Sequence, residues 1–370
     1  MSSLELSDKF NIITNLFADV NINPFIESPK MEHYRNKINL SFGKYNGNIE
    51  VGELQKDKTV IPAKLNKHAS IIGIKICEFM RDWIIKSSDF GVINYNDYTG
   101  LWRHITIYNN RFHHVMIVFH LQNVTEYKHE WELEFSNLKF KLDKFISENN
   151  YYLNSIYLQN SNTKKETRNN DPYYLIYGYK NYCEVLDNYS FKISPGSFFQ
   201  VNSDTAEIIY NKIKDISEIN KESIVLDMCC GTGTIGCFLA NSCNLVYSID
   251  TNNNNIQDAK TNRYLNQIKN QNIIKGKIED VIPKILNKYT DLSNITAIIN
   301  PPRKGIGINM CNFIKNSKIK KIVYVSCNIN SFKKDLDNME ITNKEIKEII
   351  PINQFPSTKH FEIIANIMRI

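Results

Sequence analysis

The stretch from residue 224 to residue 250 limits the possible folds of this chain more than any other. An apolar run at 224–226 breaks into a glycine-rich loop, an amphipathic helical pattern continues to residue 240, and a second apolar run ends in Asp250. A strand, glycine loop, helix, strand and acid in this order are typical of a nucleotide site in a doubly wound, Rossmann-like sheet. The loop glycines, in G-x-G-x-x-G spacing, are Gly231, Gly233 and Gly236.

Asp227 indicates which nucleotide suits this loop, because it lies just before the glycines. A carboxylate there would repel the pyrophosphate of NAD or FAD, which needs amide donors and a helix N-terminus. S-adenosylmethionine has no phosphate, and an acid suits its sulfonium and ammonium groups. Asp250 can accept hydrogen bonds from both ribose hydroxyls. We therefore expect S-adenosylmethionine as the cofactor, against the alternative of a βαβ unit without a ligand.

Length and composition bound the class of protein. At 370 residues with 42% hydrophobic content, the chain can fold as two domains with packed cores. The net charge of +6 is compatible with a polyanionic partner but does not require one. None of the eight cysteines belongs to a C-x-x-C pair, so we expect no metal site.

The cellular environment is predicted from what the sequence lacks. No stretch is apolar and long enough to span a membrane, and the N-terminus does not read as a signal peptide. Several cysteines lie in apolar runs, as free thiols do in a reducing compartment. We expect a soluble, cytoplasmic monomer without a membrane partner.

Residues 1–192 show a mixed α+β pattern, in which Asn46-Gly47 is a strong hairpin signal. The segment 160–172 has no apolar residue to bury and is predicted to be a mobile loop. The other expected elements are helices at 4–17, 69–86 and 132–148, a β-meander at 31–54, strands at 102–108, 115–120 and 152–159, and a hairpin at 173–187.

Residues 193–370 alternate strands and helices from residue 224 onward, which predicts an α/β domain with a doubly wound sheet. A loop at 194–202 precedes its first helix. The expected elements after residue 250 are helices at 253–266, 280–288 and up to 315, strands at 273–275, 297–300 and 321–325, and a final strand at 363–370.

Polar side chains follow the apolar runs of this second domain. Asn300 and Cys327 each end a predicted parallel strand, at the sheet edge where ligands bind. A thiol beside a sulfonium can act as a nucleophile, although a cysteine at a strand end also packs as a small hydrophobe. His360 and Glu362 share one strand face and can serve one pocket as acid or base, unless they form an exposed polar pair.

Together these motifs resemble the RNA uracil-5-methyltransferase family, in particular its eukaryotic-type tRNA (uracil-5-)-methyltransferases. The resemblance covers nearly the whole chain in the family's motif order, and implies a Rossmann-like methyltransferase domain at 193–370 behind an RNA-binding domain at 1–192. The matching stretches are HYRNKINLSFG (33–43), DYTGLWRHITI (97–107), SPGSFFQVN (194–202), VLDMCCGTGTIG (225–236), NPPRKG (300–305), VSCN (325–328) and FPSTKHFE (355–362).

The resemblance implies methylation of C5 of a uridine, the 5-methyluridine of the tRNA T loop, with S-adenosylmethionine as the methyl donor. Cys327 is expected to add to C6, which makes C5 nucleophilic, and Glu362 to remove the C5 proton so that the cysteine is released. The residues expected to hold the cofactor are Gln200, Asp227, Gly231, Gly233, Asp250, Asp280 and Asn300.

Three positions depart from the family pattern. Asn300 stands where the family has Asp, Ile329 where it has Pro, and Asn353 where it has an acid. Asn300 is the most consequential of the three, because a neutral amide replaces a carboxylate beside the substrate.

RNA contacts are expected from the first domain and from the loop at 194–202. Phe198 and Phe199 can stack on a flipped base or pack in the core. The candidate phosphate contacts are Arg35, Lys37, Arg103 and the basic segment 164–168, with solvated surface cations as the alternative.

Two other functions stay open. A neutral Asn300 allows an RNA-binding or RNA-folding protein with weakened or lost methyl transfer, although both Cys327 and Glu362 are retained. The Asn-Pro-Pro motif alone also occurs in amino-methyltransferases, but an aromatic usually follows the prolines there, and this chain has Arg303.

Overall fold

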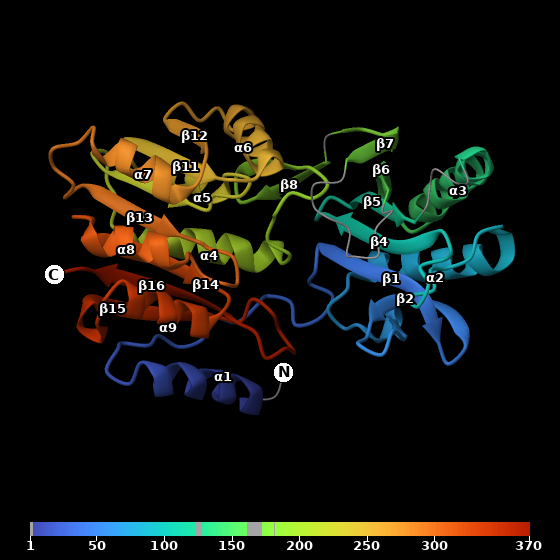
Figure 1. The fold of residues 1–370 in the computed structure, drawn as a ribbon, viewed down its shortest axis with the longest axis horizontal. Helices are drawn as coiled ribbons and strands as arrows, with labels where there is room; N and C mark the ends of the chain where they lie inside the picture. Colours follow the sequence, from blue (N-terminus) through green and yellow to red (C-terminus); the bar gives the residue numbers. More distant parts are fainter. Residues whose placement is uncertain (1–2, 123–127, 161–171, 181) are drawn as a thin grey trace. The chain divides into compact units, whose positions relative to one another are not determined.

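The computed structural model describes residues 3–122, 128–160, 172–180 and 182–370. It divides into two compact units, drawn in Figure 1. Unit 1 comprises residues 1–31, 185–193 and 197–370, and unit 2 comprises residues 32–184 and 194–196. The expected single boundary at residue 192 is therefore replaced by a division in which the N-terminal segment belongs to unit 1. The loop expected at 160–172 lies outside the described residues, apart from Asn160 and Pro172.

Unit 1 contains the predicted doubly wound sheet, in the order β12-β11-β10-β13-β14-β16-β15. The first five strands in this order are parallel, and β16 runs antiparallel between β14 and β15. The strands are β10 (Ile224–Met228), β11 (Leu245–Asp250), β12 (Gln271–Lys275), β13 (Ile295–Ile299), β14 (Lys321–Ser326), β15 (Ile346–Ile352) and β16 (Glu362–Met368).

Helices cover both faces of this sheet. On one face, α1, α7, α8 and α9 share a hydrophobic core with the strands, and α4, α5 and α6 pack on the other face. The helices are α1 (Ser3–Leu16), α4 (Ser203–Ile216), α5 (Thr234–Ala240), α6 (Asn253–Leu265), α7 (Ile278–Leu286), α8 (Ile308–Asn316) and α9 (Ile329–Asn338), with a short 3₁₀ helix η2 (Asn343–Glu345) before β15.

The N-terminal segment was expected in the first domain but packs against the sheet of unit 1. Phe17, which follows α1, lies with its ring 5.5 Å from the ring of Phe332 in α9. After the helix, the Asn23 N–H donates to the Ile349 carbonyl (2.9 Å) and the Ile26 N–H donates to the Pro351 carbonyl (2.9 Å). These bonds cover the edge strand β15, whose polar groups would otherwise be open to pairing with another chain.

Unit 2 is a second seven-stranded sheet, in the order β3-β2-β1-β4-β5-β6-β7, with α2 and α3 packed on one face. Asn46 and Gly47 both have positive φ in the β1–β2 turn, which confirms the predicted hairpin. The elements are β1 (Lys37–Tyr45), β2 (Asn48–Leu54), β3 (Val60–Pro62), η1 (Ala63–Leu65), α2 (Ile71–Ser87), β4 (Trp102–Asn109), β5 (His114–Leu121), α3 (Lys128–Glu148), β6 (Tyr152–Asn160) and β7 (Tyr173–Gly178).

The hairpin expected at 173–187 is wrong in its position. Residues 173–178 form β7, which pairs with β6 in the large sheet, and the separate hairpin consists of β8 (Tyr182–Leu186) and β9 (Tyr189–Ile193). The turn lies at Asp187, which adopts a left-handed φ of 52° as Asp tolerates, whereas Gly178 (φ 77°) ends β7.

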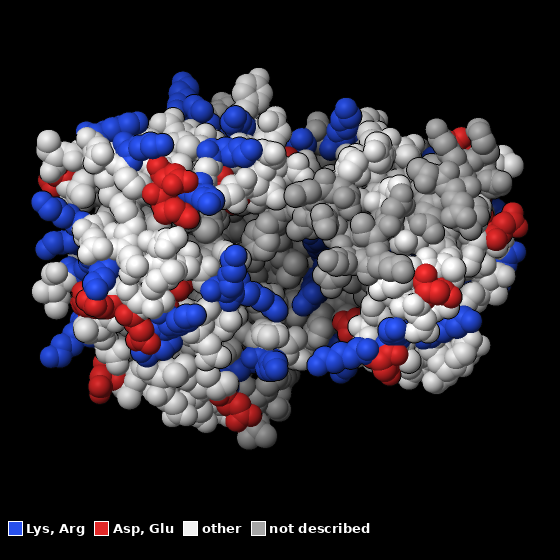
Figure 2. All heavy atoms as spheres, in the orientation of Figure 1, with Lys and Arg blue, Asp and Glu red and all other residues white. Residues whose placement is uncertain are grey.

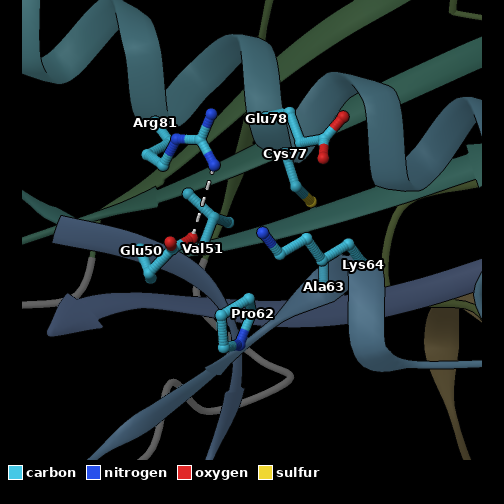
Figure 3. A pocket seen from close by; sticks show the side chains of 8 residues that line it. All are labelled: Glu50, Val51, Pro62, Ala63, Lys64, Cys77, Glu78 and Arg81. Atoms are coloured by element: carbon cyan, nitrogen blue, oxygen red, sulfur yellow. Dashed lines mark ion pairs between the residues drawn. The ribbon is translucent and has the colours of Figure 1, made fainter. Parts of the chain in front are cut away.

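Unit 2 also holds the small cavity of Figure 3, which is too small for a substrate. Its volume of about 10 Å³ admits one water at most, and Arg81 and Glu50 form an ion pair beside it (3.8 Å). All eight cysteines are free thiols. Among the described residues, none of the helices has the length and apolar character that a membrane span needs.

Candidate active site at the carboxyl edge of the unit 1 sheet

The predicted site residues lie on adjacent strand ends of unit 1. In spatial order, Asp250 ends β11, the glycine loop follows β10, Asn300 follows β13, Cys327 follows β14, and Glu362 begins the antiparallel β16. Neighbouring strands are about 4.8 Å apart, so the Asp250 and Cys327 positions are separated by roughly 14 Å. A ligand bound at Asp250 can therefore extend across the strand ends toward the thiol.

The glycine loop has the backbone shape that its sequence predicts. Gly231 (φ 56°) and Gly233 (φ 78°) are left-handed, and Gly233 begins α5. Cys229 shares this conformation (φ 62°), which is uncommon for a residue with a side chain. The Gly231 N–H donates to Asp250 Oδ2 (3.0 Å), so the loop is tied to the end of the neighbouring strand.

Asp227 is fully buried and ties the start of α5 to β11. Its Oδ2 accepts hydrogen bonds from the Gly236 N–H (3.1 Å) and the Ser248 hydroxyl (3.0 Å). Its Oδ1 is buried and has no hydrogen-bond partner among the described residues. Burial raises the pKa of this carboxyl to about 7, opposed by its bonds to Ser248 and Gly236. Asp227 therefore shapes the loop and also presents one oxygen that lacks a donor.

Asp250 is half-buried, and both of its carboxylate oxygens accept backbone hydrogen bonds. Oδ1 accepts from the Asn252 N–H (2.7 Å), and Oδ2 accepts from Gly231 and from the Asn255 side chain (3.2 Å). Oδ1 accepts one hydrogen bond and keeps a second lone pair, so the carboxylate can also accept from a ribose hydroxyl. These bonds hold the acid in one orientation beside the glycine loop.

Phe198 and Phe199 have different environments. Phe199 is buried and packs near Phe191, with ring centroids 6.2 Å apart, so it belongs to the core. Phe198 is 57% exposed, and its ring would lie 3.5 Å from a Cβ at Gly231. The Phe198 ring therefore borders the glycine loop and is available for stacking.

Gln200 joins two of the predicted motifs. It is buried, and its Oε1 accepts from Gln354 Nε2 (3.1 Å) in the loop before β16. Asn202 Nδ2 also donates to the Gln354 carbonyl (3.2 Å). The segment 197–202 is thus fixed to the loop that leads to Glu362.

Asp280 is the predicted cofactor residue that the geometry favours least. Its side chain is exposed in the first turn of α7. The preceding residue, Glu279, is half-buried and contributes to the raised pKa of Cys229, after burial and the charges of Asp250 and Asp227. Sequence reasoning missed Glu279, and the adjacent pair of acids gave no signal to choose between them.

Cys327 and Glu362 lie next to each other across two paired strands. Ser326, the last residue of β14, pairs with Ile363, so Cys327, the next residue, lies opposite Glu362 at the start of β16. Glu362 is buried, and burial raises its pKa to about 8, opposed by the charge of Arg303. Burial, and then the charge of Glu362, also raises the pKa of the half-buried Cys327 thiol. The sequence alone does not show that Cys327 and Glu362 are neighbours, because they lie far apart in it. Their proximity follows from the strand register.

The expected phosphate contacts in unit 2 are poorly exposed. Arg103 is buried, and its Nη1 donates to Gln122 Oε1 (2.9 Å). Lys37 is half-buried, with its Nζ 5.0 Å from the Tyr108 ring centroid. Arg35 is half-buried as well. The segment 164–168 lies outside the described residues.

Exposed cations occur instead at the candidate site. Arg303 and Lys304 in the loop after β13, and Lys359 in the loop before β16, are all exposed. These two loops, residues 300–307 and 353–361, contain no acidic residue. Figure 2 shows a group of Lys and Arg side chains near the position of β14 in Figure 1. Sequence analysis gave Arg303 no role.

The residues of this edge fit S-adenosylmethionine. Asp250 retains an acceptor for a ribose hydroxyl, the unpaired Oδ1 of Asp227 suits a cationic ligand end, and the left-handed Gly231 and Gly233 let the backbone approach closely. The described side chains include no group of three or more His, Cys, Asp or Glu residues able to hold a metal ion. At the β14–β16 end of this edge, the chain itself offers the thiol of Cys327 beside the buried carboxyl of Glu362.

Comparison with known proteins identifies the family. The family profile described as tRNA (Uracil-5-)-methyltransferase matches residues 2–369. The chain belongs to this family. Members of the tRNA (uracil-5-)-methyltransferase family are RNA methyltransferases that use S-adenosylmethionine, and this chain is one of them.

Relatives within the tRNA (uracil-5-)-methyltransferase family come from distant organisms. The chain is 31% identical over 360 residues to an uncharacterised RNA methyltransferase of Oceanobacillus iheyensis, covering 94% of this chain and 74% of the relative. It is 29% identical over 373 residues to the tRNA (uracil-5-)-methyltransferase homolog B of Danio rerio, covering 92% and 75%. These similar values do not single out the eukaryotic-type branch.

A solved structure has the same fold. The tRNA (uracil-54, C5)-methyltransferase of Pyrococcus abyssi, crystallised with S-adenosyl-L-homocysteine, aligns with a TM-score of 0.74 at 23% identity. The alignment covers 99% of this chain and 83% of the Pyrococcus chain. This agreement confirms the expected architecture of a Rossmann-like methyltransferase fold.

Proposed function

We propose that this chain methylates C5 of a uridine in tRNA through a transient covalent bond between Cys327 and C6 of the base. The observation that carries this proposal is that Cys327 and Glu362 adjoin the last pair of the β14–β16 register, at the strand edge that also bears Asp250 and the glycine loop. One nucleophile and one base, next to each other, are what a C5 methylation with covalent activation requires.

The cofactor is assigned to the β10–β11 end of the site. Gln200, Asp227, Gly231, Gly233, Asp250 and Asn300 are proposed as its surroundings, and Glu279 is favoured over Asp280. The presence of S-adenosyl-L-homocysteine in the Pyrococcus abyssi enzyme supports the choice of cofactor. When bound, S-adenosylmethionine supplies an electrophilic methyl group to C5 of the base.

The chain's own residues activate and release the base. The Cys327 thiolate adds to C6, and the electron pair of the C5–C6 bond moves toward the C4 carbonyl, which makes C5 nucleophilic. After methylation, the Glu362 carboxylate takes the proton from C5, the C5–C6 double bond forms again, and the C6–S bond breaks. A carboxyl with a pKa of about 8 is mostly protonated near neutral pH, so its ionised fraction carries out this step, and that fraction grows as the pH rises toward 8.

RNA binding is proposed at the same edge of unit 1. The exposed Arg303, Lys304 and Lys359 suit phosphate groups, because their two loops carry no competing acid. The exposed Phe198 ring beside Gly231 suits stacking on a base removed from its helix. The T-loop uridine is the proposed target, in line with the name of the Pyrococcus enzyme, and unit 2 is proposed to contribute further RNA contacts.

The amino-methyltransferase alternative explains less of the site. It assigns no task to Cys327 or Glu362, and Arg303 stands where such enzymes place an aromatic residue. A protein that only binds RNA would likewise need no thiol paired with a buried carboxyl. The covalent mechanism gives each of these groups a role.

The proposal is tested by trapping the covalent intermediate. Labelled tRNA transcripts that contain the target uridine are incubated with S-adenosylmethionine and either the wild type, Cys327→Ala or Glu362→Gln, and are then separated on a denaturing gel. Glu362→Gln should accumulate a slowly migrating protein–RNA band, because methyl transfer proceeds but the C5 proton stays. Cys327→Ala should give neither the band nor 5-methyluridine in nucleoside analysis.

Cys183→Ala serves as the matched control, because this half-buried cysteine belongs to unit 2. It should methylate at the wild-type rate. If Cys327→Ala still produces 5-methyluridine, the covalent mechanism is refuted. If the wild type methylates an exocyclic amine instead, the proposed reaction is wrong.

A further inference from the structure

Arg303 lies in the loop that follows β13, next to the strand that carries Cys327. Its guanidinium lowers the pKa of the Cys327 thiol by charge and hydrogen bonding, and its charge also lowers the pKa of Glu362. The same cation therefore acts on both members of the proposed catalytic pair.

The pair needs such a cation because its two groups oppose each other. The nucleophile is the thiolate, yet burial and the Glu362 carboxyl both raise the pKa of Cys327. Two adjacent anions in a partly buried site destabilise each other, whereas an opposite charge within a few ångströms stabilises both. Glu362 from β16 and Arg303 are the charged side chains that act on Cys327, and the cation opposes the carboxyl.

The backbone around Arg303 is held in place from two sides. The Gly305 N–H donates to the Pro302 carbonyl (2.9 Å), which closes a turn around Arg303 and Lys304. Asn328, the residue after Cys327, donates from Nδ2 to the Arg303 carbonyl (3.0 Å). The residue after the nucleophile thus fixes the backbone of the residue that carries the cation.

Asp335 in α9 anchors the end of this turn. Its buried carboxylate accepts the Ile306 N–H (2.9 Å) and the Tyr324 hydroxyl (2.5 Å) on Oδ2. A Cβ at Gly305 would overlap the same carboxylate, and the φ of Gly305 is +84°. A bound turn with no room for a side chain is a rigid support for the residue that it carries.

We propose that Arg303 stabilises the thiolate of Cys327 beside the Glu362 carboxyl, and that Asp335 and Asn328 position Arg303 for this task. The inference rests on the proposed function, in which Cys327 adds to the base. It differs from a role for Arg303 in phosphate binding, because its effect on the thiol is present without RNA.

The test measures thiolate formation directly. The protein, without RNA or cofactor, is alkylated with iodoacetamide between pH 7 and pH 11.5, because the pKa of Cys327 is raised, and modification of the Cys327 peptide is followed by mass spectrometry. Arg303→Gln should move the midpoint of the alkylation profile upward by about one pH unit, since an adjacent opposite charge shifts a pKa by roughly that amount. Arg303→Lys, which retains the charge, should show a smaller shift.

Lys304→Gln is the matched control, because it removes an exposed positive charge from the neighbouring position. It should leave the midpoint in place. An unchanged midpoint in Arg303→Gln, or an equal shift in Lys304→Gln, would overturn the proposal. Asn328→Ala keeps the cation and loosens its support, so it should move the midpoint in the same direction as Arg303→Gln.

The proposed function and this inference can be refuted independently of each other. A wild type that makes no 5-methyluridine, yet shows the Arg303-dependent alkylation shift, would refute the methylation reaction and leave the thiolate assignment standing. If the wild type methylates normally, but Arg303→Gln and Arg303→Lys both have the alkylation profile of the wild type, the thiolate assignment is refuted and the methylation reaction stands.

Discussion

Glu362 keeps its proton in the folded chain at a pH where an exposed carboxyl has lost it, and this makes the stability of unit 1 depend on pH. Its pKa rises from 4.5 to about 8 because it is buried. For an acid with a raised pKa, the folded state binds more protons than the unfolded state. The stabilisation by the neutral form is therefore complete below the unfolded pKa and is lost as pH rises toward the folded pKa.

The size of the effect follows from these two values. Between pH 5 and pH 8 the unfolded carboxyl is mostly ionised, while the folded carboxyl stays mostly protonated until the end of the range. The free energy of unfolding should fall by about 3.5 kcal/mol over this interval from Glu362 alone. Glu362→Gln has nearly the same shape and cannot ionise, so it should lack this loss. Groups on which Glu362 does not act, such as Asp227, titrate alike in both proteins and cancel in the difference.

The assay must separate the two units. The three tryptophans of the chain, Trp83, Trp102 and Trp131, all belong to unit 2, so their fluorescence in urea reports only that unit. Unit 1 can be followed by a short pulse of a fast thiol reagent that modifies its buried Cys237 and Cys311 once they are exposed. Urea transitions at pH 5 and pH 8, read by peptide mass spectrometry, give the free energy of each unit for both proteins.

The wild type should lose about 3.5 kcal/mol more than Glu362→Gln in the thiol-detected transition, and the fluorescence-detected transition should be alike in the two proteins. If the wild type and Glu362→Gln show the same pH dependence in the thiol-detected transition, the reasoning is refuted. Such a result would mean that Glu362 is solvated or ionised in the folded chain, and the base assigned to the reaction would then titrate as an ordinary carboxyl.

The other predictions concern the cofactor and the substrate side of the site. Asp250→Ala should weaken the binding of S-adenosylhomocysteine by about 1.5–3 kcal/mol, because charge-assisted hydrogen bonds are lost. Calorimetry would show this, with the exposed Asp280→Ala as the control, and an equal loss in both variants would contradict the assignment. Asn300→Asp restores a carboxylate between the cofactor end and the thiol, and should raise the single-turnover rate of 5-methyluridine formation. An unchanged or lower rate would show that the amide is not limiting.

The parts of the fold that sequence predicted are those written in short-range patterns. The run from Ile224 to Asp250 encodes its strands, left-handed loop and helix locally, so the glycine loop and its acid were correctly placed. The hairpin at Asn46-Gly47 follows from backbone preferences of two residues in the same way.

The parts that sequence did not predict depend on contacts between distant residues. The pattern at 4–17 shows an amphipathic helix, but only its packing against α9 shows which unit it joins. Strand β15 and helix α9 were not expected either. The N-cap at Asn328, whose side chain accepts the Asn330 N–H (3.1 Å), was the available signal for α9.

In the candidate site, too, short-range motifs could be predicted and contacts between distant residues could not. Cys327 and Glu362 were proposed from motifs, but their adjacency depends on strand register, which pairs residues near 326 with residues near 363. Arg303 was considered only because amino-methyltransferases usually have an aromatic residue at its position. Its effect on the thiol depends on a turn anchored by Asp335, 32 positions away, and no local pattern encodes such a support.

The order of the strands in unit 1 has a consequence for folding. β16 follows both β14 and β15 in the chain, yet it lies between them in the sheet. The last two strands can first pair with each other as an antiparallel hairpin, and β16 must then dock along β14 to complete the sheet. Since β16 begins with Glu362, the step that closes the sheet also brings the carboxyl to the thiol. Under the proposed mechanism, a newly made chain with a formed cofactor loop but an undocked β16 would bind its ligand and remain inactive, so its catalytic activity would report the last stage of its maturation.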